Sequence, residues 1–273
     1  MKIQYNIIKF NHAREGCIVF QNERYAKIYE ILQQRGSVTV QYLEKQLYVS
    51  EATIRRDLDA LEKSGLLQRV WGGAMLHTVD KDIPSFVRLK SNQDKKEKIA
   101  SVASLFLKSS TSIFFDSSTS CLPLVPYIAE LKNIKVVTSS LKMSLELGQS
   151  TDAAVNLLGG AVYEDYILSG HLAVNSVRQY HTDMMFFSCS GISSACGITS
   201  IEPKVVEVCQ EMMKHTALKI LLCDSTKVGK NALLRLADLG EVDYVIMDEI
   251  PENDPELVSA LGSRLVTERS QIR

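Results

Sequence analysis

The fold is decided by residues 47–74, which read LYVSEATIRRDLDALEKSGLLQRVWGGA. Ser50 is a residue type that caps the start of a helix, because its hydroxyl can accept a hydrogen bond from a backbone N–H of the first turn. Ile54, Leu58 and Leu61 follow at helical spacing and form one apolar stripe. The stretch therefore predicts a capped helix with one buried face and one face open to solvent.

The outer face of this helix and the segment behind it carry residues suited to DNA. Thr53, Arg55 and Arg56 fall off the apolar stripe and are expected to face outward. The Gly72-Gly73 pair predicts the turn of a small hairpin. An outward arginine pair followed by a glycine-tipped hairpin is typical of a winged helix-turn-helix bound to DNA. The predicted DNA-binding residues are Ser50, Thr53, Arg55, Arg56, Arg69, Trp71, Gly72 and Gly73.

Residues upstream complete a unit of three helices. Apolar residues at helical spacing predict a first helix over about Glu23–Gln34 and a short second helix over Val40–Leu47, with Gly36 between them. Gly65 ends the third helix, as glycine commonly does just past the last turn. A helix of about eight residues is marginal in isolation, so we expect the three helices to fold together.

The composition favours a globular protein of the cytoplasm. With 273 residues and 45% hydrophobic content, the chain is long enough for one small and one medium-sized domain. We find no run of about 18 apolar residues that would span a membrane, and no signal-peptide pattern. The six cysteines and five histidines show no metal-ligand spacing. We therefore expect reduced thiols, no metal and no cofactor.

The net charge does not by itself support DNA binding. The chain carries a formal net charge of −1, and residues 21–78 hold eight lysines and arginines against seven acids. The local arrangement matters more, because the acids Glu44, Asp59 and Glu62 could lie away from the DNA-facing arginines. A nearly neutral unit predicts weak nonspecific binding and a dependence on dimerisation. We therefore expect a homo-oligomer, either a dimer or a tetramer.

The second half of the chain alternates between short apolar segments and helical segments. A polar stretch after Leu76 leads into a helix that we expect over Lys95–Leu107. The expected strands are Ser112–Phe115, Ile134–Val137, Val155–Leu158, Met184–Ser188, Leu218–Cys223 and Tyr244–Met247. This alternation predicts an α/β domain with a mostly parallel sheet that is covered on both faces. Ligands of such sheets bind beyond the carboxyl ends of the strands.

Hydroxyl groups gather at the expected strand ends. The loops over residues 116–120 and 138–140 are rich in serine and threonine and precede expected helices, while Lys227 follows a later strand. Backbone N–H groups and hydroxyls at the start of a helix favour an anion such as phosphate. The predicted effector-binding residues are Asp116, Ser117, Ser118, Thr119, Ser120, Thr138, Ser139, Ser140, Gly191 and Lys227. Their expected ligand is a phosphorylated small molecule.

Both halves of the chain resemble the DeoR family of bacterial transcriptional regulators. In the first half the matching residues are Val49, Ser50, Thr53, Ile54, Arg55, Arg56, Asp57, Leu58, Leu61, Gly65, Arg69, Gly72, Gly73 and Ala74. In the second half they are Asp116, Thr119, Ser120, Gly159, Gly160, Gly170, Gly191, Gly197, Ile198, Thr199, Asp224 and Lys227. The resemblance implies a winged helix-turn-helix joined to an effector domain with the fold of ribose-5-phosphate isomerase. It also implies a sugar phosphate as effector and repression of carbohydrate-metabolism genes.

The chain departs from the family pattern at several positions. Trp71 stands where the family commonly has histidine or tyrosine, Ser118 where it has glycine, and Ser139 where it has asparagine. Cys209 falls where a basic residue is common. These differences leave open the contact made by the wing and the identity of the sugar.

The expected domain organisation has five parts. These are a flexible arm or misplaced start over residues 1–20, a DNA-binding domain over 21–77, a linker over 78–92, an effector-binding domain over 93–250 and a C-terminal tail or helix over 251–273.

Two other functions remain open from the residues alone. One is a sugar-phosphate isomerase with an appended DNA-binding module, for which Asp116, Glu202 or Glu207 would supply the base. The other is an assembly protein, which would leave the phosphate-like rim without a role. A turnover assay with sugar phosphates and a gel shift on the gene's own upstream DNA distinguish these alternatives from a regulator.

Overall fold

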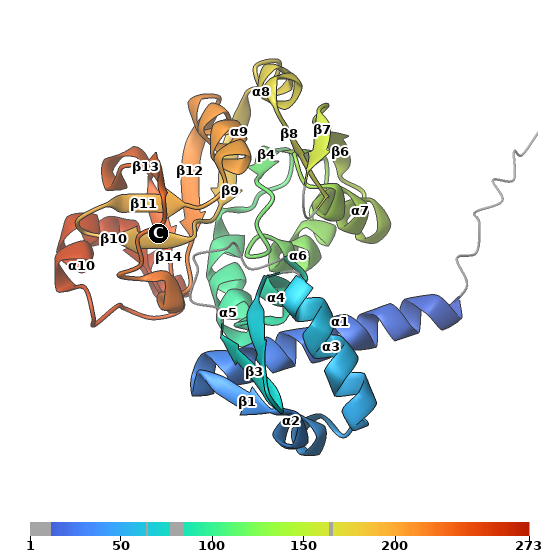
Figure 1. Ribbon diagram of the computed structural model, residues 1–273. Helices are drawn as coiled ribbons and strands as arrows, with labels where there is room; N and C mark the ends of the chain where they lie inside the picture. Colours follow the sequence, from blue (N-terminus) through green and yellow to red (C-terminus); the bar gives the residue numbers. More distant parts are fainter. Residues whose placement is uncertain (1–11, 64, 77–84, 164–165, 273) are drawn as a thin grey trace, which may run out of the picture. The chain divides into compact units, whose positions relative to one another are not determined.

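The computed structural model of the chain divides into two compact units, residues 1–91 and 92–273 (Figure 1). The structure describes residues 12–63, 65–76, 85–163 and 166–272. Each unit has its own hydrophobic core, and the two units are described separately below.

The first unit consists of helices around a small antiparallel sheet. Its elements are α1 (His12–Arg35), β1 (Ser37–Thr39), α2 (Val40–Leu47), α3 (Glu51–Lys63), β2 (Leu67–Val70), β3 (Gly73–Leu76) and α4 (Ser85–Lys90). The strands pair in the order β1-β3-β2. Ile54, Leu58 and Leu61 of α3 are buried in the core, as their spacing in the sequence predicts. The three helices and the hairpin of a winged helix-turn-helix are therefore present.

Two boundaries of this unit differ from the sequence-based expectation. The helix α1 begins at His12 rather than near Glu23, so part of the expected arm over residues 1–20 is helical. The rest of that arm, residues 1–11, lies outside the described residues. The expected linker over 78–92 contains α4, whose Val87 is buried in the core of the first unit, while residues 77–84 lie outside the described part. A six-residue helix is too short to reveal an apolar repeat in the sequence.

A buried ion pair holds α3 against α1. Asp57 of α3 is 1% exposed, and both of its carboxylate oxygens accept hydrogen bonds from the Arg24 guanidinium, at 2.7 and 3.0 Å. The two-point geometry fixes the angle between the side chains as well as their distance. Asp57 directly follows Arg55 and Arg56, so α3 is anchored from its inner face while the arginines stay outside.

The second unit is an α/β domain built on a seven-stranded parallel sheet. Its helices and main strands are α5 (Gln93–Ala103), β4 (Ser112–Phe115), α6 (Val125–Ala129), β5 (Lys135–Thr138), α7 (Leu141–Ser150), β6 (Ala154–Leu157), α8 (His171–Val177), β9 (Thr182–Phe187), α9 (Pro203–Lys214), β12 (Thr216–Leu222), β14 (Tyr244–Ile246), α10 (Pro255–Leu261) and β15 (Leu265–Val266). The strand order is β15-β14-β12-β9-β4-β5-β6, and every neighbouring pair is parallel. The six strands expected from the sequence are all present, with boundaries shifted by at most two residues.

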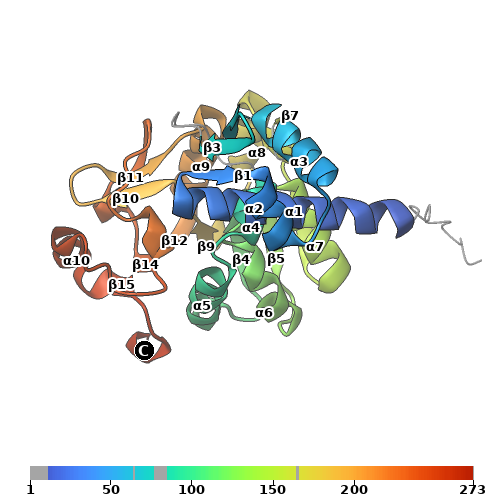
Figure 2. The ribbon, with the colours of Figure 1, turned by 60° about the horizontal axis from the view of Figure 1, so that its bottom comes forward.

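Helices cover both faces of this sheet. The side chains of Phe114 and Phe115 are fully buried on opposite faces, because successive residues of a strand alternate. The core around Phe114 includes residues of α8, α9 and α10, and the core around Phe115 includes residues of α5, α6 and α7. Figures 1 and 2 show α8 and α9 on one side of the sheet and α5 and α6 on the other.

The shorter strands were not expected from the sequence. They form a hairpin of β7 (Ala161–Tyr163) and β8 (Ile167–Ser169), and an antiparallel sheet of β10 (Gly191–Ser193), β11 (Gly197–Ser200) and β13 (Leu234–Ala237). The segment expected as a C-terminal tail or helix over residues 251–273 contains the helix α10, and its strand β15 pairs with β14 in the main sheet. A strand of two residues carries no readable apolar pattern.

The ion pair behind α3 predicts a specific loss of stability. Substituting Arg24→Met leaves the Asp57 carboxylate buried without its partner, and we expect the free energy of unfolding to fall by about 2 kcal/mol, because Arg24 is partly exposed. Lys27→Met is the matched control, since the Lys27–Glu30 pair on the same helix is exposed. Urea denaturation measures both changes. Equal losses in the two variants would show that Asp57 does not depend on Arg24.

Candidate functional site

The start of α3 has the capping geometry expected from the sequence. The Ser50 hydroxyl accepts a hydrogen bond from the Thr53 backbone N–H at 3.3 Å and lies 3.0 Å from the Thr53 hydroxyl. The cap satisfies one of the free N–H groups of the first turn, so the helix has a defined start. This start carries the residues that a recognition helix directs into a DNA groove.

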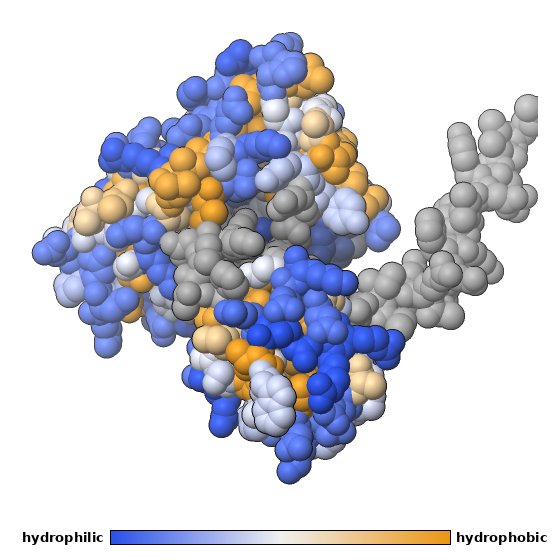
Figure 3. Space-filling view, viewed as in Figure 1, coloured by the Kyte–Doolittle hydropathy of each residue, from blue (hydrophilic) through white to orange (hydrophobic). Residues whose placement is uncertain are grey.

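Arg55 and Arg56 lie on the exposed side of α3, as predicted. Arg55 forms an ion pair with Glu51 one turn earlier, at 2.6 Å, and both side chains are about half exposed. An exposed pair of this kind contributes little to stability, so Arg55 can exchange Glu51 for another anion at small cost. The side of α3 seen in Figure 3 is covered by hydrophilic residues.

Arg69 differs from the other two arginines because it fastens the hairpin to α3. Its guanidinium contacts the Asp59 carboxylate and donates to the Arg55 carbonyl at 3.2 Å, while its own backbone N–H donates to Glu62 at 2.7 Å. Asp59 and Glu62 therefore lie beside Arg69 rather than away from it. The sequence did not reveal these contacts, because the partners of Arg69 lie seven to fourteen residues away from it.

The wing is the β2–β3 hairpin, and its tip is Trp71-Gly72. The Trp71 side chain is fully exposed, and Gly72 has a positive φ of 77°. A side chain at Gly73 would begin 2.0 Å from the Val38 carbonyl oxygen, so only glycine lets β3 lie this close to β1. The two glycines therefore shape the wing, and Trp71 is the side chain that the wing presents to solvent.

In the second unit, Asp116 organises the carboxyl edge of the parallel sheet. Asp116 follows β4 and is buried, and its carboxylate accepts the backbone N–H of Ser118 at 2.9 Å and that of Ser188 at 3.0 Å. The Cys121 thiol also donates to it, at 3.3 Å. Burial raises the pKa of Asp116, although these hydrogen bonds partly oppose the shift. The loop after β4 is thereby tied to the loop after β9.

Lys96 of α5 is a site residue that the sequence did not single out. Its ammonium lies 3.4 Å from the Thr119 hydroxyl, and its side chain is buried. In the sequence Lys96 belongs to the charged run DKKEK, and such a run predicts side chains exposed to solvent. Thr119 and Ser120 are also buried. The helix expected after them begins two residues later, as a 3-10 helix (Leu122–Leu124) that continues into the five-residue α6.

The hydroxyls after β5 are used within their own loop. Ser140 caps α7 by accepting the Met143 N–H at 3.1 Å, and the Thr138 hydroxyl accepts the Ser140 N–H at 3.1 Å. The Ser139 carbonyl accepts the Leu168 N–H of β8 at 2.8 Å. Thr138, Ser139 and Ser140 are all buried. Their first role is therefore to hold this loop in place, beside the loop that carries Ser117 and Ser118.

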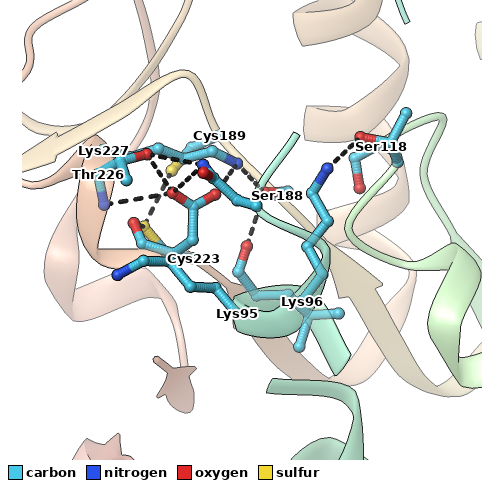
Figure 4. A network of polar contacts seen from close by, with 12 residues as sticks. Lys95, Lys96, Ser118, Ser188, Cys189, Cys223, Thr226 and Lys227 are labelled. Atoms are coloured by element: carbon cyan, nitrogen blue, oxygen red, sulfur yellow. Dashed lines mark hydrogen bonds and ion pairs between the residues drawn. The ribbon is translucent and has the colours of Figure 1, made fainter. Parts of the chain in front are cut away.

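Lys227 reaches the end of the neighbouring strand β9. Its ammonium donates to the Ser188 hydroxyl at 2.9 Å and lies 3.5 Å from the Asp224 carboxylate (Figure 4). Burial alone would raise the pKa of Asp224, but Lys227, the hydrogen bonds from Thr226 and the charge of Lys96 together lower it. Figure 4 shows Lys227 directed toward Ser188, and Lys96 directed toward the loop of Ser118.

Gly191 has a structural explanation of its own. A side chain at this position would begin 2.1 Å from the Lys230 carbonyl oxygen. Only glycine, which has no side chain, allows the backbone to lie this close to Lys230. Gly191 begins β10 in the smaller antiparallel sheet, and its carbonyl accepts the Thr199 hydroxyl at 3.1 Å. Of the predicted effector-binding residues, Thr119 lies beside the ammonium of Lys96, and Lys227 supplies a second ammonium at the end of β9.

A cavity of about 770 Å³ lies beside this edge, but its charge does not suit a phosphate. Among its lining residues are four carboxylates and two lysines, namely Asp248, Glu249, Glu252, Glu268, Lys95 and Lys98. Lys95 is already paired with Asp248 at 2.7 Å and Glu249 at 3.1 Å. An anion entering this cavity would meet a net negative charge.

The carboxylates that an isomerase would use as a base have other roles. The oxygens of Asp116 accept backbone N–H groups of two loops. Glu202 caps α9 and accepts the Tyr163 hydroxyl at 3.3 Å, while Glu207 is exposed on α9. These roles argue against the isomerase alternative.

The described residues contain no cluster of three or more histidine, cysteine or acidic side chains that could hold a metal ion. In the same part of the chain, each helix is too short or too polar to cross a membrane.

Comparison with known proteins connects both units to one family. The DeoR-like helix-turn-helix domain matches residues 24–79, and the DeoR C terminal sensor domain matches residues 91–249. The HTH-type transcriptional regulator GolR of Listeria innocua is 32% identical over 84% of this chain and 91% of its own. The HTH-type transcriptional repressor GlcR of Bacillus subtilis is 29% identical over 85% of this chain and 90% of its own.

Among solved structures, a ribose 5-phosphate isomerase from Plasmodium falciparum is similar with a TM-score of 0.37 and 12% identity, covering 50% of this chain and 54% of that one. The two matched domains cover the recognition helix and wing in the first unit and the parallel sheet in the second. The chain belongs to the DeoR family of DNA-binding transcriptional regulators.

Proposed function

We propose that this regulator represses carbohydrate-metabolism genes and that a phosphorylated sugar releases it from its operator. In this proposal α3 and the wing bind the operator, and the sugar phosphate binds at the carboxyl edge of the parallel sheet. The relative GlcR, which is named as a repressor, supports the direction of the effect.

The observation that carries the effector part is the pair of lysines at two neighbouring strand ends. Lys96 directs its ammonium to Thr119 after β4, and Lys227 directs its ammonium to Ser188 after β9. The strands β4 and β9 are adjacent in the sheet. Two ammonium groups with neighbouring hydroxyls and loop N–H groups supply the charge and the donors that a phosphate requires.

The DNA-binding part acts as a homo-oligomer in this proposal. The first unit is nearly neutral, so a single copy would gain little from the charge of the DNA backbone. Two linked copies that bind two half-sites about one helical turn apart would add their binding free energies and so bind far more tightly than one copy. Because bacterial DNA lies in the cytoplasm, we expect the protein to act there.

The first test concerns the outward arginines of α3. A base-reading arginine contributes roughly 1–3 kcal/mol, so we expect Arg55→Ala and Arg56→Ala each to weaken operator binding at least several-fold. The thermal stability should stay unchanged, because both side chains are exposed. Gel shifts with DNA from upstream of the gene measure the affinity.

Arg235→Ala is the control for these variants. Arg235 is an exposed arginine paired with Asp238 in the second unit, as Arg55 is paired with Glu51 in the first. The control should bind DNA like the unaltered protein. If Arg55→Ala and Arg56→Ala also bind normally, α3 is not the recognition helix.

The second test concerns the effector. We expect calorimetry to detect binding of a sugar phosphate but not of the corresponding free sugar, and the sugar phosphate to weaken the gel shift. Lys96→Met and Lys227→Met should each lower the affinity for the sugar phosphate at least about tenfold, because each removes a charge-assisted contact.

Lys98→Met on α5 is the control, because Lys98 lines the acidic cavity rather than the strand ends at Thr119 and Ser188. Operator binding without ligand should be the same in all three variants. Absence of binding across common pentose and hexose phosphates would contradict the proposed effector class. Normal binding by both Lys96→Met and Lys227→Met would move the site away from β4 and β9.

A further inference from the structure

Tyr48, in the turn between α2 and α3, combines a costly conformation with nearly complete exposure. Its φ of 53° and ψ of 39° lie in the left-handed region. Its backbone N–H donates to the Glu44 carbonyl at 3.0 Å and so closes α2. Its side chain is 93% exposed, so the ring gains almost no packing.

Folding alone does not account for a tyrosine at this position. Glycine and asparagine enter the left-handed region at lower cost than residues with bulkier side chains. Strained backbone conformations cluster at binding and active sites, so a strained residue without a packing gain is a candidate for binding. The position of Tyr48 indicates which partner it would bind.

Tyr48 lies two residues before Ser50, the cap of the recognition helix. In a helix-turn-helix the first turns of that helix enter the major groove, and the preceding helix crosses the DNA backbone. A side chain in the turn between them is therefore brought next to the phosphates. A tyrosine hydroxyl is one of the donors that proteins use for DNA phosphates.

We propose that Tyr48 binds the operator by donating its hydroxyl hydrogen to a backbone phosphate beside the groove that α3 enters. Such a contact adds affinity and fixes the register of α3, but it does not read the base sequence. The Trp71 side chain, exposed at the wing, lies after α3 in the chain, so exposed aromatic residues precede and follow the recognition helix.

The test separates a contact with DNA from a role in folding. Tyr48→Phe removes only the hydroxyl, and we expect an unchanged Tm with a loss of roughly tenfold in affinity for the operator and for a random duplex alike. Tyr48→Gly removes the side chain and the backbone strain together. It should raise the Tm while losing at least as much affinity.

Tyr166→Gly is the control, because Tyr166 is another exposed tyrosine with a positive φ, 60°, but it lies in the second unit. It should raise the Tm without changing DNA binding. Full affinity of Tyr48→Phe would overturn the proposed hydroxyl contact. A lower Tm of Tyr48→Gly would show instead that the turn needs the tyrosine for folding.

A separate observation concerns Asn92, which joins α4 to α5. Asn92 has φ 56° and ψ 37°, and its carbonyl accepts the Lys96 N–H at 3.0 Å in the first turn of α5. Its side-chain amide donates to Asp224 at 3.3 Å and to Thr226 at 3.2 Å. The residue at which the second unit begins is thus bonded to the loop that carries Lys227.

Two further residues in the first turn of α5, Lys95 and Lys96, also form hydrogen bonds at the carboxyl edge of the parallel sheet. Lys95 donates to Ser225 at 2.5 Å, and Lys96 reaches Thr119. The Asp224 carboxylate contacts both residues: it accepts a hydrogen bond from the Asn92 amide and forms an ion pair with Lys227. A phosphate bound by Lys227 would compete with Asp224 for that lysine and so alter the hydrogen bond between Asp224 and Asn92.

We infer that Asn92 is a positioning residue that transmits effector binding to the chain segment leading to the DNA-binding unit. The inference rests on the proposed effector site. A ligand shifts an equilibrium only through contacts that differ between its states, and the hydrogen bonds of Asn92 supply such a difference.

Asn92→Gly tests this inference, because glycine keeps the left-handed backbone and removes the amide. We expect normal operator affinity without ligand, and an affinity for the sugar phosphate that is equal or higher, because the ligand no longer disturbs the bond between Asp224 and Asn92. The ratio of operator affinities with and without ligand should fall toward one. Asn133→Gly is the control, since Asn133 also has a positive φ, 58°, in another loop of the second unit.

Hydrogen exchange tests the same link without any ligand. In Asn92→Gly the amides of Thr226 and Lys227 should exchange faster, because the Asp224 loop loses a bond. A variant that keeps the full response to ligand, or that leaves this exchange unchanged, would overturn the inference. Failure of the unaltered protein to bind any sugar phosphate would instead contradict the proposed function, and the exchange result would still decide the link.

Discussion

The carboxyl edge of the parallel sheet depends on buried carboxylates that hold the loops beyond it. Asp116, Asp224 and Asp248 follow β4, β12 and β14, and each is at most 5% exposed. Each accepts at least one backbone N–H from a loop, as when Asp248 accepts the Ser225 N–H at 2.7 Å. A buried charge is tolerated only when it is hydrogen-bonded or paired, so these carboxylates and their loops fix one another.

The same carboxylates explain why lysines gather at this edge. Lys95, Lys96 and Lys227 reach it from α5 and from the loop after β12. Lys95 pairs with Asp248 and Glu249 and also donates to the Ser225 hydroxyl, while Lys96 and Lys227 direct their ammonium groups to the hydroxyls of Thr119 and Ser188. The acidic cavity, which is lined by Lys95, and the proposed phosphate site at Lys96 and Lys227 therefore lie near the same edge of the sheet.

Six of the seven strands of the parallel sheet could be predicted because they are short and mostly apolar runs, as in β4, where both Phe114 and Phe115 are buried. The short strands β7, β8, β10 and β11 have no such run and were missed. Lys96 was missed because its burial depends on α5 lying against the sheet, which no local pattern reveals. The outward placement of Arg55 and Arg56 followed from helical spacing alone, but the anchoring of Arg69 depended on contacts distant in sequence.

Consecutive residues of α3 face in opposite directions, one toward the core and two toward solvent. Asp57 is buried against Arg24, while Arg55 and Arg56 are exposed on the other side of α3. Because Arg24 satisfies Asp57 from behind, the outward arginines are not needed to neutralise it. Arg69 and Asp59 close the hairpin onto α3 in a similar way. The side chains left exposed beside α3 are those of Arg55, Arg56 and the aromatic residues Tyr48 and Trp71, and these are the residues proposed to meet DNA.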